Sequence, residues 1–152
     1  YKIDIKIARI FNTYGPNMRK DDGRVISNFI WNAINDKPLI IYGTGSQSRS
    51  FCYVDDTING LIKLMDSNLN CPVNIGNPNE LSILDIAKKI IFLLNKNKYD
   101  FKFIELPEDD PTNRNPDIKR AKDELKWLPT INLENGLLKT IEYFKKIQLF
   151  HS

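Results

Sequence analysis

Histidine and cysteine are scarce in this sequence of 152 residues. The single histidine, His151, stands at the second-last position, so the body of the chain has no imidazole to act as a general base. The two cysteines, Cys52 and Cys71, stand beside apolar residues and lack metal-ligand spacing. We expect two reduced core thiols and no metal site. No group of residues suits hydrolysis, phosphoryl transfer or metal catalysis.

Long apolar runs and blocks of like charge are also missing. No apolar run approaches the length of a membrane span, and no signal-peptide pattern opens the chain. The formal net charge is only +3 and lysines alternate with acidic residues, which argues against a nucleic-acid-binding groove. We expect one soluble domain. Because a strand-like alternation begins within two residues of Tyr1, we also expect an N-terminally truncated fragment.

Strand-like and helix-like patterns alternate along the chain. Alternating or short continuous apolar runs predict strands at 2–11, 39–42, 50–53, 73–75 and 101–106. Apolar residues at helical spacing predict helices at 24–36, 55–65, 82–94, 117–125 and 133–147. This alternation is typical of an α/β fold.

Several polar residues are best explained as helix caps. Ser82 is followed three residues later by Asp85, which resembles a capping box. Asp55 and Asp56 stand where a helix is expected to begin. Adjacent carboxylates suggest acid–base catalysis, but we favour an N-cap at one of them because capping is far more common.

The stretch from Ile7 to Pro16 is the first candidate binding segment. A mostly apolar run changes there into Asn12 and Thr13 and then into a Gly-Pro turn. Buried parallel strands end in this way at a ligand crevice. The amide of Asn12 can both donate and accept hydrogen bonds toward a ligand. The alternative is that Asn12 bonds only to its own turn.

Two arginines are expected in loops opposite this segment. Arg49 follows a glycine-containing loop, and Arg114 lies in the proline-rich loop 107–116. A planar guanidinium group suits a diphosphate because it offers several donors in a fixed fork. The alternatives are a surface salt bridge for Arg49 and an ion pair with Asp109 or Asp110 for Arg114.

Longer segments resemble a known family. The segments are RIFNTYGP at 9–16, YGTGSQSRSFCYVDD at 42–56, VNIGNPNELSILDIA at 73–87 and NRNPDIKRAKDELKW at 113–127. In this order they resemble the C-terminal part of extended short-chain dehydrogenases/reductases, the NAD-dependent epimerase/dehydratase group that acts on nucleotide sugars. DDGRVISNFI at 21–30 and DDPTNRNPDI at 109–118 are most similar to the UDP-glucuronate decarboxylase branch.

The resemblance implies a specific fold and reaction. It implies that residues 1–152 are the C-terminal portion of a Rossmann-type fold, with the last parallel strands and a small substrate-binding lobe. The branch oxidises UDP-glucuronate at C4 with bound NAD, loses carbon dioxide from the 4-keto intermediate, and reduces the product to UDP-xylose. A C4 ketone is β to the C6 carboxylate, so it can accept the electrons left by carbon dioxide.

The resemblance also implies residue roles. The expected substrate-binding residues are Asn12, Tyr42, Arg49 and Arg114. The expected cofactor-binding residues are Thr13 and Arg24. Tyr42 would border the uracil as a flat apolar wall, with a purely packing tyrosine as the alternative. Arg24 has the alternative of a solvated residue at a helix start.

Two signatures of the family are absent from the sequence. The 152 residues contain neither a Gly-x-x-Gly-x-x-Gly loop nor a Tyr-x-x-x-Lys pair. We therefore expect the NAD-binding half and the catalytic residues upstream of Tyr1, and an inactive isolated chain. The alternatives are a nucleotide-sugar 4,6-dehydratase, a 4-epimerase, or a non-catalytic nucleotide-sugar-binding protein. In the complete protein we expect a homodimer, located in the cytoplasm, or in the Golgi lumen if an upstream anchor exists.

Overall fold

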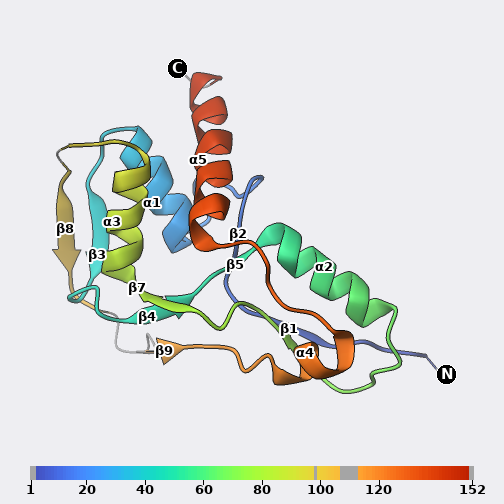
Figure 1. Cartoon of the computed structure of the whole chain (residues 1–152). Helices are drawn as coiled ribbons and strands as arrows, with labels where there is room; N and C mark the ends of the chain where they lie inside the picture. The colour runs from blue at the N-terminus through green and yellow to red at the C-terminus, as the bar shows by residue number, and fades with distance from the viewer. Residues whose placement is uncertain (1–2, 98, 107–112, 151–152) are drawn as a thin grey trace.

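The fold has a larger and a smaller lobe joined by short strands (Figure 1). A computed structural model describes residues 3–97, 99–106 and 113–150. In the larger lobe, β3 (Leu39–Tyr42) and β8 (Phe101–Ile104) form a parallel pair. The helices α1 (Val25–Ile34), α3 (Ile83–Leu93) and α5 (Leu133–Leu149) complete this lobe. Their apolar stripes meet in one core cluster, which explains why these helices form there.

The smaller lobe repeats the same plan with fewer elements. Strands β1 (Ala8–Ile10) and β6 (Val73–Ile75) pair in parallel. The helices α2 (Val54–Met65) and α4 (Lys119–Leu125) pack beside them around a second apolar cluster. Both lobes therefore contain parallel strands and helices, which confirms the predicted α/β class.

Short strands connect the two lobes. Parallel strands β2 (Thr13–Tyr14) and β5 (Cys52–Tyr53) form one pair. A three-stranded sheet has the order β7-β4-β9, with β7 at Glu80–Ser82, β4 at Ser48–Ser50 and β9 at Asn113–Arg114. The sequence patterns did not predict β2, β7 or β9. These strands are two or three residues long and depend on partners far away in the chain.

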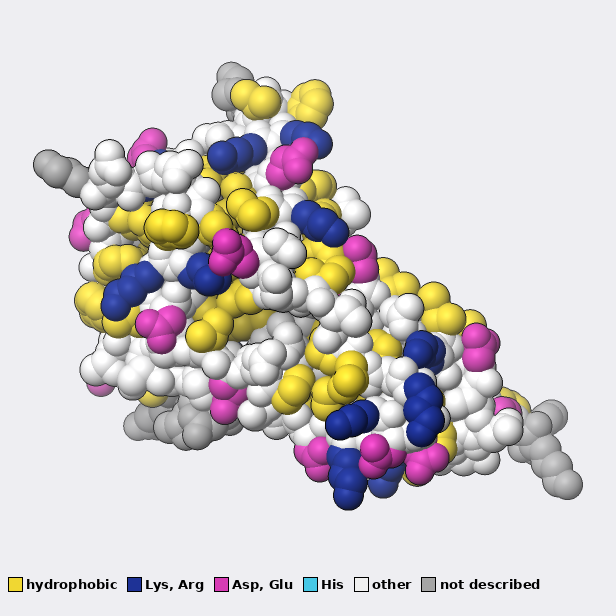
Figure 2. Space-filling view, in the orientation of Figure 1, with side chains coloured by type: hydrophobic (Ala, Val, Ile, Leu, Met, Phe, Trp, Pro, Cys, Tyr) yellow, Lys and Arg dark blue, Asp and Glu magenta, His cyan; other side chains and the backbone are white. Residues whose placement is uncertain are grey.

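The first predicted strand is only partly correct. Strand β1 contains three residues, whereas the prediction covered 2–11. Ile3, Ile5 and Ile10 are exposed, so the predicted buried strand is not observed here. The reason is that β1 pairs only with β6 in the described part of the chain. Apolar side chains are also exposed along the edge that α2 occupies in Figure 1, as Figure 2 shows.

The helix caps give one confirmation and one correction. Ser82 accepts a hydrogen bond from the Asp85 backbone N–H at 3.0 Å, as the predicted capping box requires. The predicted N-cap at Asp55 or Asp56 is wrong, because α2 begins at Val54 and its N-cap residue is Tyr53. Both carboxylates instead lie in the first turn of α2, where negative charge is favourable toward the helix dipole.

The cysteines, the candidate metal ligands and the helix lengths can each be described for the residues that the structure covers. Cys52 is buried and Cys71 is partly buried, and both are free thiols. Residues 3–97, 99–106 and 113–150 contain no group of three or more candidate metal ligands. Within the same ranges, no helix has the length and apolar content needed to cross a membrane.

Candidate functional site

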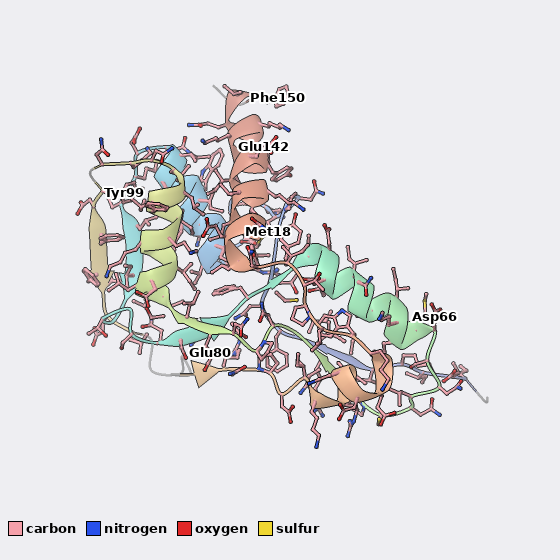
Figure 3. The ribbon with its side chains drawn as sticks, viewed as in Figure 1. Met18, Asp66, Glu80, Tyr99, Glu142 and Phe150 are labelled. Carbon is pink, nitrogen blue, oxygen red and sulfur yellow. The ribbon has the colours of Figure 1, made fainter. Side chains whose placement is uncertain are left out.

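A hollow of about 550 Å³ lies between β2, the start of α1 and β4. Four of the predicted site residues line it: Asn12, Thr13, Arg24 and Arg49. Apolar side chains form much of the remaining wall, namely Phe11, Met18, Val25 and Phe51. Met18 is labelled in Figure 3 between α5 and α2. The hollow therefore has polar groups at several points around an apolar wall, as small-molecule sites commonly do.

Asn12 presents a free amide to this hollow. Its backbone carbonyl accepts a hydrogen bond from the Cys52 N–H at 2.8 Å, which fixes the backbone against β5. The side-chain amide makes no hydrogen bond to another residue in the part of the chain that the structure describes. The structure therefore gives no support to the alternative that the Asn12 side chain bonds only to its own turn. The amide has its donors and acceptor available for a ligand.

Arg49 and Arg114 lie in strands and not in the predicted loops. Arg49 is in β4, Arg114 is in β9, and the two residues are direct partners in the parallel register. Local sequence did not reveal this, because β4 is held by segments more than 30 residues away on both sides. Partners in register project from the same face of a sheet. The two arginine side chains therefore start from neighbouring positions on one face.

The two arginines differ in their surroundings. Arg49 is 8% exposed, and its Nη1 donates to the Ser48 carbonyl at 2.8 Å. Arg114 is exposed and does not line the large hollow. Its predicted alternative partners, Asp109 and Asp110, lie outside the described residues.

Arg24 is held at the rim of the hollow by an aspartate that the sequence patterns did not single out. Asp22 Oδ1 accepts hydrogen bonds from the Arg24 N–H at 3.0 Å and from Ser27 Oγ at 2.5 Å. Arg24 Nε lies 3.6 Å from Asp22 Oδ2, and the arginine side chain is 66% exposed. Asp22 thus fixes the start of α1. The signal for it was its position two residues before Arg24, the N-cap residue of α1.

Thr13 lines the hollow, but its hydroxyl group has partners within the fold. Its Oγ1 donates to the Phe11 carbonyl at 3.0 Å and lies 3.1 Å from Thr57 Oγ1. The hydroxyl therefore links β2 to α2. Tyr42, in contrast, is 44% exposed at the end of β3 and does not line this hollow. That exposure speaks against Tyr42 as a core residue, and its contact with a uracil stays a prediction.

A smaller hollow of about 210 Å³ shares Arg49 and Phe51 with the large one. Its wall also includes Asn77 and residues 129–133. Asn77 is buried, and its Oδ1 accepts a hydrogen bond from the Asn79 N–H at 3.0 Å. No sequence pattern predicted this second hollow, because its walls come from three distant parts of the chain.

Two groups with raised pKa values lie at the large hollow or next to it: Tyr14 lines the hollow, and Cys52 follows Phe51, which also lines it. Burial is the main cause that raises the pKa of Tyr14 far above its ordinary value. Its hydroxyl donates to the Leu133 carbonyl at 3.2 Å. Burial also raises the pKa of Cys52 to about 11. Both groups are therefore neutral at physiological pH, and neither is tuned to act as a general base.

Comparison with known proteins identifies the family and the fold of the chain. A model of the NAD dependent epimerase/dehydratase family matches residues 1–76, which is half of the chain. The chain belongs to this family. Epimerase/dehydratase proteins of known structure have the same fold as the chain. It superposes with a TM-score of 0.88 on UDP-glucuronic acid 4-epimerase from Bacillus cereus, at 33% identity, covering 95% of this chain and 46% of that one.

Curated members of the family include nearer relatives in sequence. The chain is 49% identical over 144 residues to UDP-glucuronic acid decarboxylase 1 of Xenopus tropicalis, covering 95% of this chain and 34% of that protein. It is 49% identical over 135 residues to UDP-glucuronic acid decarboxylase 3 of Arabidopsis thaliana, covering 89% and 39%. The chain thus spans about a third of the length of these relatives. It is a homologue of UDP-glucuronic acid decarboxylases.

The epimerase/dehydratase family is NAD-dependent, so the fit of this chain to NAD can be assessed. A dinucleotide pyrophosphate is normally held by a glycine-rich turn between a strand and a helix. The sequence has no Gly-x-x-Gly-x-x-Gly loop, and the segment before α1 carries one glycine, Gly23. Of the two expected cofactor residues, Thr13 already uses its hydroxyl group within the fold. Among the residues that the structure describes, no glycine-rich turn is therefore present to hold a dinucleotide pyrophosphate.

Proposed function

We propose that the chain supplies the nucleotide-sugar-binding part of a UDP-glucuronate decarboxylase. The complete protein would convert UDP-glucuronate into UDP-xylose and carbon dioxide with NAD as cofactor. The observation that carries this proposal is the direct register of Arg49 and Arg114 in neighbouring parallel strands. The 49% identity to curated decarboxylases supports the choice of reaction.

The arginine pair suits the diphosphate of a nucleotide sugar. Two guanidinium groups side by side can each form paired hydrogen bonds to phosphate oxygens. Arg49 is nearly buried, so its interaction with an anion is weakly screened by solvent. Arg114 is exposed and can close over a ligand from the solvent side. Together they would bind the charged centre of the substrate and fix its orientation.

The sugar would then lie in the large hollow. Asn12 offers an uncommitted amide for sugar hydroxyl groups or for the diphosphate. Phe11 and Phe51 provide apolar surface against the sugar ring. We retain Thr13 and Arg24 as candidates for the side of the hollow that faces the cofactor. The role of this chain's residues is thus to bind and orient the substrate, and not to carry out proton transfer.

A binding measurement tests the proposed site. UDP-glucuronate should bind the chain in isothermal titration calorimetry, and Arg49→Ala or Arg114→Ala should each lower the affinity by about tenfold or more. Lys88→Ala is the matched control, because it removes an exposed positive charge from α3, away from the hollow. Unchanged affinity in both arginine variants would remove the proposed site.

Turnover by the chain alone is not expected. The sequence has no Tyr-x-x-x-Lys pair, and its only histidine is at position 151. Incubation of the chain with UDP-glucuronate and NAD should therefore release no carbon dioxide above background. Release at an enzymatic rate would contradict this part of the proposal. Dimerisation of the complete protein stays a prediction that sedimentation can test.

A second candidate is a UDP-glucuronate 4-epimerase. It is favoured by the TM-score of 0.88 and 33% identity to the B. cereus 4-epimerase. Product analysis of a complete protein that contains this chain separates the two reactions. UDP-xylose and carbon dioxide support decarboxylation, whereas a C4-epimeric UDP-uronate without carbon dioxide supports epimerisation.

A further inference from the structure

A ring of hydrogen bonds joins the β2 wall of the large hollow to α2 and to the segment before α5. The first link is between Thr57 Oγ1 of α2 and Thr13 Oγ1 of β2, which lie 3.1 Å apart. Thr57 donates in this link because the Thr13 hydroxyl hydrogen goes to the Phe11 carbonyl, and the Tyr53 carbonyl lies farther from Thr57 Oγ1, at 3.4 Å. Thr57 is 4% exposed, so this contact between hydroxyl groups is shielded from solvent. The link fixes the residue that follows Asn12 against the first turn of α2.

Asp56, the residue directly before Thr57, provides the second link. Its two carboxylate oxygens accept from Thr130 Oγ1 and from the Ile131 N–H, both at 2.9 Å. Its backbone carbonyl also accepts from Trp127 Nε1 at 3.0 Å. Asp56 is only 5% exposed. Asp56, which was predicted as a helix cap, thus fastens residues 127–131 to α2 through its carboxylate and its backbone carbonyl.

Tyr14 closes the ring. Its hydroxyl group donates to the Leu133 carbonyl at 3.2 Å, two residues after the Asp56 contact. The close approach depends on Gly136 of α5, because a Cβ atom there would lie 2.1 Å from the Tyr14 hydroxyl oxygen. Tyr14 also lines the large hollow directly after Asn12 and Thr13. The ring therefore begins and ends on β2.

Such a ring restrains the hollow more than its separate contacts would. Tyr14, Asp56 and Thr57 are each at least 95% buried, so a broken link leaves a polar group without water to replace its partner. Buried networks whose members are all satisfied hold one geometry. The ring also joins elements distant in sequence, since Tyr14 and Leu133 are 119 residues apart.

We propose that Tyr14, Asp56, Thr57 and Thr130 are positioning residues, which hold β2 so that Asn12 faces the ligand in the large hollow. None of them is assigned a contact with substrate. The inference rests on the proposed function, because the large hollow must be the nucleotide-sugar site. It adds that residues 127–136 and α5 are required for the geometry of that site.

The test compares variants that differ by one hydroxyl group. Tyr14→Phe and Thr57→Val each remove one link of the ring with little change in volume, whereas Thr57→Ser keeps the hydroxyl group. In titration calorimetry we expect the first two variants to weaken UDP-glucuronate binding by about three- to tenfold. Thr57→Ser should restore binding to within about twofold of the native chain. The control is Ile86→Val, which trims a buried residue of α3 outside the ring.

Two outcomes would overturn the positioning role. One is unchanged UDP-glucuronate affinity in both Tyr14→Phe and Thr57→Val. The other is an equal loss of affinity in Ile86→Val, which would indicate a general effect of lower stability. If the native chain binds no UDP-glucuronate at all, the proposed function fails, and NMR spectra without ligand then test the ring by themselves.

The ring is also testable without ligand. In amide NMR spectra, Tyr14→Phe should shift the signals of Asn12 and Ile131, and Thr57→Val should shift those of Asn12 and Leu133. Ile86→Val should leave these signals in place. If the ring variants change only the signals of their immediate sequence neighbours, the links do not act together and the inference is wrong.

Discussion

The two lobes are stabilised in different ways. The core of the larger lobe is built from side chains on three helices and on strands β2, β3 and β5, and it is almost wholly aliphatic or aromatic. The core of the smaller lobe is a short apolar cluster centred on Trp127, with polar contacts from Asp56 at its border. Burial of apolar area is thus the main source of stability in the larger lobe. The smaller lobe depends more on specific hydrogen bonds.

This difference explains where the large hollow lies. Strands β2 and β5 connect the lobes, and each is only two residues long. Tyr14 and Tyr53 of these strands belong to the larger core, whereas Cys52 belongs to the smaller one. The wall of the hollow is therefore held from both sides. Changes in either lobe can alter its geometry, but through different interactions.

The largest effect is expected from truncation in the larger core. Phe144 of α5 is completely buried and its ring contacts Trp31 and Tyr143. Phe144→Ala should lower the free energy of unfolding by about 3 to 5 kcal/mol, because it removes apolar contacts and leaves a cavity. Denaturant unfolding followed by circular dichroism measures this. A loss below about 1 kcal/mol would show that the larger lobe does not depend on this core.

A smaller loss is expected from removal of the polar anchor of the other lobe. Asp56→Ala leaves the Ile131 N–H and the Thr130 hydroxyl group without their acceptors. We expect a loss of about 2 to 3 kcal/mol in the free energy of unfolding. Asp55→Ala is the matched control, since Asp55 is exposed in the same helical turn, and should change stability by about 0.5 kcal/mol or less. Equal effects would refute a special role for Asp56.

A third effect depends on pH and concerns the strands between the lobes. Burial raises the pKa of Cys52 from an ordinary value of 9.0 to about 11, so the folded chain retains this proton to higher pH than the unfolded chain. The resulting stability is complete below pH 9 and is lost as the pH rises toward 11. We expect a decrease of about 1 to 2 kcal/mol over this range. Tyr14 changes stability in the same direction.

Urea titrations at several pH values measure this slope. Cys52→Ala should make the slope between pH 9 and 11 shallower, because the buried thiol is removed. An unchanged slope in this variant would mean that Cys52 does not contribute to the pH dependence.

The smallest effect is expected at the surface. Lys89 of α3 lies 3.2 Å from Glu134 of α5, and both side chains are substantially exposed. Lys89→Ala should cost about 0.5 kcal/mol or less, and added salt should reduce even that difference. Thermal melts with and without 0.5 M salt, roughly the level that screens surface pairs, provide the measurement. A larger cost would show that ion pairs, and not only apolar burial, stabilise the larger lobe.

The sequence predicted those helices and strands whose apolar pattern or cap can be recognised within a single segment. The helices were correctly expected because their apolar stripes and caps, such as Ser82, can be read within a single segment. Strand β3 was found with its observed bounds. The short strands β7 and β9 were missed, because two or three residues have no readable period and are fixed by partners elsewhere in the chain.

Part of the lining of the large hollow was named from the sequence, but its geometry was not predicted, and the binding roles of these residues stay predictions. Asn12, Thr13, Arg24 and Arg49 were named from sequence, and they line one hollow. The pairing of Arg49 with Arg114 could not be foreseen, because a parallel register between distant segments leaves no local pattern. Asp56 was assigned to the wrong role for the same reason. Its partners, Thr130 and Ile131, are more than 70 residues away.

The central claim is that Arg49 and Arg114 together bind a diphosphate, and calorimetric titration of the chain with UDP and with uridine tests it most directly. The account predicts that UDP binds at least about tenfold more tightly than uridine, and that this preference disappears in the Arg49→Gln, Arg114→Gln double variant. Equal affinities of the native chain for UDP and uridine, or a preference that survives in the double variant, would contradict it.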